Sequence, residues 1–320
     1  MVSALKNIKN SADILNEKII EKSSPIVVGI DPILTSIPSV YKEKYLNYDN
    51  PFEGVARTYV DFAFDLIDAV SDIVPAVKPQ IAFFEKYGHW GFWAFQEIVE
   101  YAHSKNLVVI EDAKRNDIGN TSKAYADGHL GKVDLLDGSV IESVGADWLT
   151  ITPFLGRDSL KPFINCCKSE KKGLFILVKT SNEGGSDYQD LITKEGKSVY
   201  EIIAEHIKIE EEGLIGTSGY SPLGVVVGAT HPLQAKEIRK LLPHSIFLVP
   251  GYGAQGGDTK NIASYFNKDG LGAIINSSRA IMNSWKESHT DQSCTQTDFK
   301  NSVRNATLLM RDDIIDALRQ

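Results

Sequence analysis

The sequence is poor in cysteine, and its three cysteines follow no recognisable pattern. Cys166 and Cys167 are adjacent, Cys294 lies far from both, and no Cys-x-x-Cys spacing occurs. This arrangement argues against a disulfide framework and against a zinc site built from paired cysteines. We therefore expect a protein of a reducing compartment that has no metal site.

Long apolar runs are also lacking, and no stretch approaches the roughly 20 apolar residues of a membrane-spanning helix. The first 22 residues mix Leu and Ile with Lys, Asn and Glu, so they lack the uninterrupted apolar core of a signal peptide. Positive charge is not in excess either, because the formal net charge is -8. We expect a cytoplasmic protein without general affinity for membranes or nucleic acid, in which a local arrangement holds any anionic ligand.

What the sequence does have is a regular alternation of short apolar runs with segments of helical periodicity. The apolar runs predict strands near residues 24–31, 73–78, 107–114, 146–152, 173–181, 223–230, 245–249 and 272–276. Helical spacing predicts helices near 52–70, 90–104, 158–170, 197–211, 232–241 and 259–267. Eight such units without a linker predict a single α/β domain, a (β/α)8 TIM barrel over residues 1–320, with terminal helices at about 1–22 and about 298–318.

The stretch from Asn106 to Thr121, N-L-V-V-I-E-D-A-K-R-N-D-I-G-N-T, changes abruptly from apolar to charged. Side chains alternate between the faces of a strand, so Asp112 and Lys114 are expected to point the same way. Asp117 follows within a turn. The pattern predicts two carboxylates flanking one ammonium at the C-terminal end of a strand, where α/β proteins usually place their chemistry.

Polar residues also end several other predicted strands, and a barrel brings all of these ends to one mouth. Any single member has a plain structural explanation, since an Asp before proline often forms a turn and a strand-end Lys is often solvated. Their recurrence at equivalent ends of successive strands favours a functional site. The residues expected at the mouth are Asp31, Lys78, Asp112, Lys114 and Lys179–Ser181.

Two segments near the end of the predicted barrel indicate a phosphate site. Glycines fill Val249–Asp258 after the seventh strand, and Arg279 follows the eighth. Exposed backbone N–H groups and a guanidinium both bind phosphate, and barrels usually place a phosphate site in these two loops. The same glycines also match the dinucleotide fingerprint G-x-G-x-x-G, but Pro250 separates them from the strand and the motif comes late in the chain.

The motifs together resemble the orotidine 5'-phosphate decarboxylase family. The segments that carry the resemblance run in order from residue 26 to residue 280. They are G-I-D-P (29–32), V-K-P-Q-x-A-F-F-E (77–85), D-A-K-R-N-D-I-G-N-T (112–121), V-K-T-S-N (178–182), P-G-Y-G-A-Q-G-G (250–257) and S-R (278–279).

The resemblance implies decarboxylation of orotidine 5'-monophosphate to uridine 5'-monophosphate, the last step of UMP synthesis, without cofactor or metal. It implies that Lys114 donates a proton to C6 of the pyrimidine within a charge array of Lys78, Asp112, Lys114 and Asp117. It also implies a homodimer with shared active sites, in which Asp117, Ile118 and Thr121 enter the neighbouring subunit's site. The substrate-binding residues that it implies are Asp31 and Lys78 with Ile118 and Thr121 at the ribose, Gln255 and Arg279 at the phosphate, Ser181 at the pyrimidine, and Pro250, Gly257 and Ser278.

Two other functions stay open at this point. One is a related barrel lyase or synthase that acts on a sugar phosphate with a metal, which needs further acidic ligands at the mouth. Glu111 does not supply one if the strand alternates regularly, because it then faces away from Asp112. The other is a nucleotide-binding protein without catalysis. The segments 132–138 and 210–221 resemble insertions, and the sequence gives no purpose for them.

Overall fold

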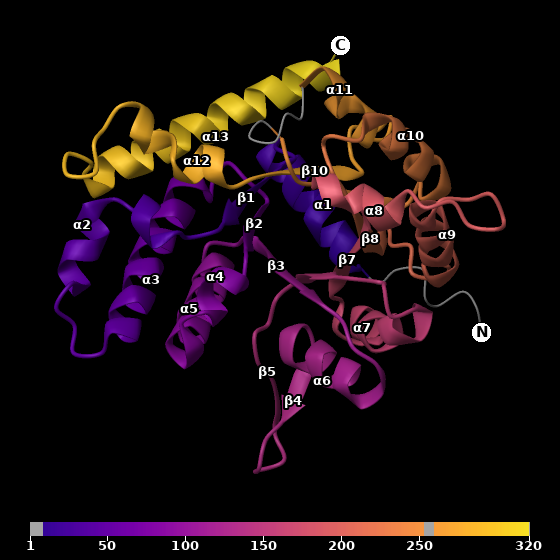
Figure 1. Cartoon of the computed structure of the whole chain (residues 1–320), viewed down its shortest axis with the longest axis horizontal. Coiled ribbons are helices and arrows are strands. Elements are labelled where there is room, and N and C mark those ends of the chain that lie inside the picture. The colour runs from indigo at the N-terminus through magenta and orange to yellow at the C-terminus, as the bar shows by residue number, and fades with distance from the viewer. Residues whose placement is uncertain (1–8, 253–258, 320) are drawn as a thin grey trace.

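The predicted barrel is confirmed by the computed structural model, which describes residues 9–252 and 259–319 (Figure 1). Eight strands pair in parallel and close on themselves, since β1 pairs with both β2 and β10. Around the barrel, the order is β1-β10-β9-β8-β7-β6-β3-β2. The strands are β1 Ile26–Ile30, β2 Ala76–Pro79, β3 Val108–Arg115, β6 Trp148–Ile151, β7 Gly173–Lys179, β8 Ser221–Val227, β9 Ser245–Val249 and β10 Ala273–Ser277.

Helices surround this barrel, and most of them lie where helical periodicity predicts them. The long ones are α3 Pro51–Val70, α5 Gly88–Ser104, α6 Gly119–His129, α7 Arg157–Glu170, α9 Val199–Glu210, α10 Pro232–Leu241 and the C-terminal α13 Gln296–Arg319, which packs on α3 (Figure 1). Short helices are α2 Ser39–Lys42, α4 Ala82–Glu85, α8 Ser186–Gln189, α11 Thr259–Ile262 and α12 Arg279–Met282. Single 3-10 turns occur at Leu34–Ser36, Glu43–Tyr45, Glu183–Gly185, Ala263–Tyr265 and Ser284–Glu287.

The strands are apolar on both faces because each face meets a separate buried cluster. Residues such as Val28 and Val109 pack outward against the helices. Their neighbours Val27 and Val108 pack inside the barrel with Trp148 and other inward side chains. The helix α1, Ser11–Lys22, contributes Ala12, Leu15 and Ile19 to the same inner cluster, so it covers the end of the barrel that carries the strand N-termini.

The segment 210–221, whose purpose the sequence does not reveal, docks on the beginning of α1. The Asp13 carboxylate accepts hydrogen bonds from the backbone N–H groups of Thr217 and Ser218, at 3.0 and 2.6 Å. The Asn10 side-chain amide donates to the carbonyl oxygens of Leu214 and Tyr220. The segment therefore fixes the helix that closes the barrel floor.

The segment 132–138 belongs to a small antiparallel ribbon, formed by β4 Lys132–Asp134 and β5 Val140–Glu142. Figure 1 shows this ribbon projecting from the body of the molecule below α6. Leu136 at its turn is fully exposed. The ribbon is an addition between β3 and β6 that leaves the barrel closed.

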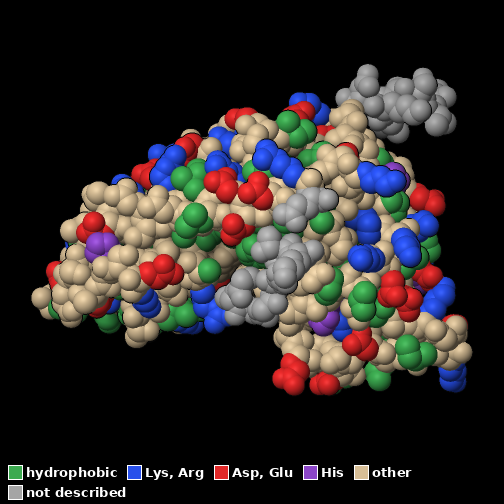
Figure 2. Space-filling model, turned by 90° about the horizontal axis from the view of Figure 1, so that it is seen from above, with side chains coloured by type: hydrophobic (Ala, Val, Ile, Leu, Met, Phe, Trp, Pro, Cys, Tyr) green, Lys and Arg blue, Asp and Glu red, His purple; other side chains and the backbone are tan. Residues whose placement is uncertain are grey.

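The surface carries charges of both signs, as expected from a sequence with 34 Lys and Arg and 42 Asp and Glu residues. On the face drawn in Figure 2, acidic and basic side chains both occur, and neither sign covers the face continuously. Within residues 9–252 and 259–319, no helix combines the length and apolar character needed to cross a bilayer.

Candidate active site

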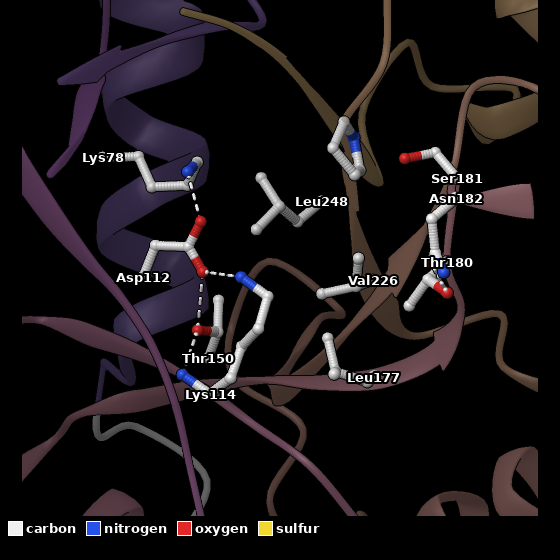
Figure 3. A pocket seen from close by; sticks show the side chains of 11 residues that line it. Lys78, Asp112, Lys114, Thr150, Leu177, Thr180, Ser181, Asn182, Val226 and Leu248 are labelled. Carbon is white, nitrogen blue, oxygen red and sulfur yellow. Dashed lines mark hydrogen bonds and ion pairs between the residues drawn. The ribbon is translucent and has the colours of Figure 1, made fainter. Parts of the chain in front are cut away.

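Asp112 and Lys114 at the end of β3 form an ion-paired group with Lys78 of β2 (Figure 3), in which Lys78 and Asp112 are buried and Lys114 is partly exposed. Asp112 Oδ2 lies 2.5 Å from Nζ of Lys78 on β2, and Asp112 Oδ1 lies 2.5 Å from Nζ of Lys114. Among the described residues, Lys114 pairs with Asp112 alone. One carboxylate therefore lies between two ammoniums within the chain, whereas the charge pattern predicts one ammonium between two carboxylates.

Lys114 reaches the group by a route that simple strand alternation does not predict. The register of β3 against β6 is irregular, because Glu111 is opposite Leu149 but Arg115 is opposite Ile151. Lys114 lies inside this bulge with φ of 50°, a left-handed conformation that residues other than glycine rarely adopt. The bulge turns the lysine back toward Asp112, so its position depends on an unusual backbone conformation.

Electrostatics in this group favours the charged forms of Asp112 and Lys78. Burial alone raises the pKa of the Asp112 carboxyl, but Lys78 and Lys114 outweigh burial and hold that pKa well below its ordinary value. Burial likewise lowers the pKa of the Lys78 ammonium, and the charges of Asp112 and Asp31 more than offset it, so that this pKa is raised. The group is thus a fixed arrangement of two positive charges and one negative charge.

Thr150 on β6 completes the group, and the sequence analysis did not identify it. Its hydroxyl donates to Asp112 Oδ1 at 2.9 Å and accepts from the backbone N–H groups of Ala113 and Lys114, each at 3.0 Å. A usable signal was present, because Thr150 alternates with Leu149 and Ile151 and is therefore the inward polar residue of a predicted strand.

Beside the ion-paired group lies a cavity of about 210 Å³. Figure 3 shows Lys78, Asp112 and Lys114 on one side of it and Ser181 and its neighbours on the other. Ser181 approaches closely because residue 228 is glycine, whose missing Cβ would lie 2.7 Å from the Ser181 backbone. The remaining lining residues are Thr150, Leu177, Thr180, Asn182, Val226, Leu248 and Pro250.

Lys179 does not line this cavity, although it was expected at the mouth. A register shift in β7 between Leu177 and Lys179 interrupts the alternation of side chains. The Lys179 ammonium lies 2.7 Å from Asp190 Oδ1, and the side chain is almost fully buried. Lys179 therefore anchors the segment after α8 and is not a mouth residue.

A second cavity of about 170 Å³ adjoins the first and shares Lys78, Asp112 and Pro250 with it. Its other walls include Asp31, Ser278 and Arg279. Ser278 packs over β1 because residue 29 is glycine, where a Cβ would lie 1.9 Å from the Ser278 hydroxyl. One oxygen each of Asp31 and Asn276 is buried without a hydrogen-bond partner among the described residues, so both can accept a ligand donor.

Three residues implied by the family resemblance lie outside both cavities of the single chain. Asp117 precedes α6 and accepts a hydrogen bond from the Ile118 N–H at 2.7 Å. Ile118 is 58% exposed, and Thr121 in the first turn of α6 is also exposed. Gln255 and Gly257 fall outside the residues that the structure describes.

Glu111 lies on the outer face of β3, as strand alternation predicts. Its Oε1 is 2.7 Å from Nδ1 of His129 on α6, and the side chain is fully buried. It therefore adds no ligand to the mouth. Within the described ranges, no three His, Cys, Asp or Glu side chains gather as a metal-ligating group.

Comparison with known proteins places this arrangement in a family. The sequence model of the orotidine 5'-phosphate decarboxylase / HUMPS family matches residues 24–290. An orotidine 5'-phosphate decarboxylase from Rhodopirellula baltica is 41% identical over 300 residues, which cover 94% of this chain and 97% of that protein. One from Caldicellulosiruptor bescii is 38% identical over 310 residues, covering 97% of this chain and 99% of the relative.

The fold comparison agrees. The solved structure of Leishmania donovani OMP decarboxylase has a TM-score of 0.70 to this chain at 28% identity, and the match covers 98% of this chain and 100% of that one. The chain therefore belongs to the orotidine 5'-phosphate decarboxylase / HUMPS family.

Proposed function

We propose that this protein decarboxylates orotidine 5'-monophosphate to uridine 5'-monophosphate, the final step of UMP biosynthesis, without a cofactor. The observation that carries the proposal is the Lys78–Asp112–Lys114 group on the wall of a cavity, within a chain 41% identical to a decarboxylase of that name. A second cavity with Arg279 and Ser278 adjoins the first, as a substrate with a phosphate remote from its reacting carbon requires.

The reaction needs positive charge that is already in place. Breaking the bond between C6 and the carboxylate releases CO2 and leaves an electron pair on a ring carbon that has no electron sink. A fixed ammonium stabilises that charge more in the transition state than in the substrate. We assign this role to Lys114, which then transfers a proton to C6 and is reprotonated from solvent.

The other residues divide between the base, the ribose and the phosphate. Ser181 faces Lys114 across the first cavity, so we assign it to the pyrimidine. Asp31 and Lys78 line the second cavity, and we assign them to the ribose hydroxyls. Arg279 can grip a phosphate through two parallel N–H groups. We also assign phosphate contacts to Gln255, Gly257 and Ser278, with Pro250 lying between the two cavities.

We further propose a homodimer in which each subunit completes the other's site. Asp117, Ile118 and Thr121 are the residues assigned to the partner's cavity. They lie outside both cavities of their own chain, and Ile118 and Thr121 are exposed, so their side chains are accessible to a second copy.

The test of the reaction is to add orotidine 5'-monophosphate and follow loss of the orotate absorbance, with and without a chelator. We expect equal turnover in both conditions. Absence of turnover contradicts the proposed reaction. Turnover that the chelator abolishes instead supports a metal-dependent barrel enzyme, the alternative that the Asp-x-Lys-x-x-Asp segment also permits.

The shared site predicts complementation between two inactive proteins. Lys114→Ala and Asp117→Ala are each expected to be inactive as homodimers. Mixed dimers contain one site with both residues intact, so about a quarter of the wild-type activity should return if subunits assort at random, while each protein incubated alone serves as control. If no mixing ratio restores activity, Asp117 does not act across a subunit interface.

A further inference from the structure

Thr150 carries three hydrogen bonds at the centre of the charged group, and it is 1% exposed. A threonine hydroxyl has one proton to donate and two lone pairs to accept. Its two acceptor positions are taken by the N–H groups of Ala113 and Lys114, each at 3.0 Å. Backbone N–H groups can only donate, so the hydroxyl proton is directed to Asp112 Oδ1 at 2.9 Å.

The two N–H groups that Thr150 binds are those of the β3 bulge. There the register against β6 advances by four residues on one strand and two on the other, from Glu111–Leu149 to Arg115–Ile151. The bulge removes Ala113 and Lys114 from the regular ladder, and the hydroxyl of a β6 side chain takes the place of a backbone acceptor. N–H groups in this partly buried bulge would be costly to leave without an acceptor, so Thr150 stabilises the bulge itself.

The same hydroxyl acts on both ends of the Lys114–Asp112 pair. It binds the backbone N–H of Lys114, whose φ of 50° aims the side chain at Asp112. It also donates to the oxygen of Asp112 that receives the Lys114 ammonium. A donor fixed on that oxygen favours the ionised carboxylate, because a protonated Oδ1 would present a second hydrogen to the hydroxyl.

We propose that Thr150 is a positioning residue for the decarboxylation: its hydroxyl holds Lys114 in its left-handed conformation and keeps Asp112 oriented as the anion between the two lysines. The inference rests on the reaction proposed above. It assigns Thr150 no contact with the reacting atoms, only control of the residues that make such contacts.

The test compares variants that separate the hydroxyl from the side-chain volume. Thr150→Val keeps the branched shape and removes the hydroxyl, whereas Thr150→Ser keeps the hydroxyl. We expect Thr150→Val to lower kcat by about 10- to 100-fold, the range expected when a charged group loses a buried hydrogen bond. KM should change by less than about threefold, because the Arg279 cavity is untouched and misplacement of Lys114 acts on the transition state.

Thr150→Ser should retain kcat to within about threefold of the wild type, since the hydroxyl is the acting group. The matched control is Thr307→Val on α13, which removes another fully buried threonine hydroxyl, one bonded to the Val303 carbonyl oxygen. It should leave kcat unchanged. Wild-type kcat in Thr150→Val, or equal losses in the Val and Ser variants, would overturn the proposal.

A crystal structure of Thr150→Val separates failure of this inference from failure of the proposed reaction. We expect Lys114 to leave its positive φ and its ammonium to move away from Asp112. If the wild type does not turn over orotidine 5'-monophosphate, the proposed reaction fails, and the positioning role is decided by this structure alone. An unchanged Lys114 overturns it. Thr150→Ala provides a second hydroxyl-free protein if the Val variant does not fold.

Discussion

The two faces of β3 carry buried carboxylates at successive positions, and the two groups have opposite surroundings. Asp112 points into the barrel mouth and lies between two ammoniums beside a cavity. Glu111 points outward and is fully buried beneath α6. Its Oε1 lies 2.7 Å from Nδ1 of His129. Two adjacent residues therefore differ in access: Asp112 lines a cavity that a ligand can enter, whereas Glu111 is buried in the protein interior.

The ionisation of the two acids differs accordingly. Lys78 and Lys114 outweigh the effect of burial at Asp112 and hold its pKa low. At Glu111 burial dominates over the attraction of His129 and Arg115, and the pKa of its carboxyl is raised. Burial therefore does not decide the charge of an acid by itself. The number of cations within contact decides it.

The outer group links β3 to two helices. Arg115 donates from Nε to His129 at 3.3 Å and forms an ion pair with Glu85 on α4. His129 ends α6, the helix whose first turn follows Asp117. We infer that the inner group serves the reaction and that the outer group holds α6 against the strand that carries the lysine.

The largest expected effect is on activity, and it is confined to the inner face. Lys114→Ala removes the ammonium assigned to the developing carbanion, so kcat should fall by about a thousandfold or more, as when a preorganised stabilising group is lost elsewhere. The control is Lys123→Ala, which removes an exposed lysine paired with Asp127 on α6 and should leave kcat within about twofold. Steady-state kinetics of both variants checks this, and a Lys114→Ala enzyme with a tenth of wild-type kcat would contradict the assignment.

The next effect is on stability, where the two acids should differ in size. Asp112→Asn leaves Lys78, which is 4% exposed, without its paired anion, so we expect a loss of about 3–5 kcal/mol in the free energy of unfolding. Glu111→Gln imitates the neutral acid that burial favours and can still hydrogen-bond to His129, so we expect about 1 kcal/mol or less. Urea unfolding of the two variants measures both values. Equal losses would mean that the Asp112 carboxylate stabilises the folded protein no more than the Glu111 carboxyl group does.

Much of this organisation could be predicted from the sequence because it depends on local periodicity. The barrel strands follow from short apolar runs, with β9 found at Ser245–Val249 as predicted and β2 beginning three residues later than predicted, at Ala76. The opposite directions of Glu111 and Asp112 follow from strand alternation. The placement of Asp31, Lys78 and Asp112 at the mouth follows from the common direction of parallel strand ends.

What could not be predicted depends on irregular backbone. Nothing in the sequence D-A-K-R marks Lys114 as left-handed, since this conformation is disfavoured for lysine and is held by contacts with another strand. The alternation of side chains along a strand likewise does not predict the bulge of β7, which turns Lys179 toward Asp190. Thr150 differs from these two, because alternation does mark it as an inward polar residue, but a threonine in a strand usually reflects β propensity alone.

The smallest expected effect is on the pH dependence of stability, where the two acids should act with opposite sign. Asp112 has a lowered pKa in the folded state, so its stabilising contribution is present above its ordinary value of 3.8 and is lost as the pH falls below that value toward the folded pKa. Glu111 has a raised folded pKa, so the folded state binds a proton first. Its contribution to stability therefore grows as the pH falls from the raised pKa to the ordinary value of 4.5.

Unfolding free energies measured against pH isolate each contribution as a difference between the wild type and one variant. The free energy of unfolding of the wild type minus that of Glu111→Gln should increase on acidification from neutral pH toward 4.5. Its slope should be at most about 1.4 kcal/mol per pH unit for one proton. The difference from Asp112→Asn should stay level over that range and shrink only below 3.8. Because the windows do not overlap, one titration series tests both acids. If both differences changed with pH in the same direction, the two faces of β3 would not shift the pKa values of their carboxyl groups in opposite directions.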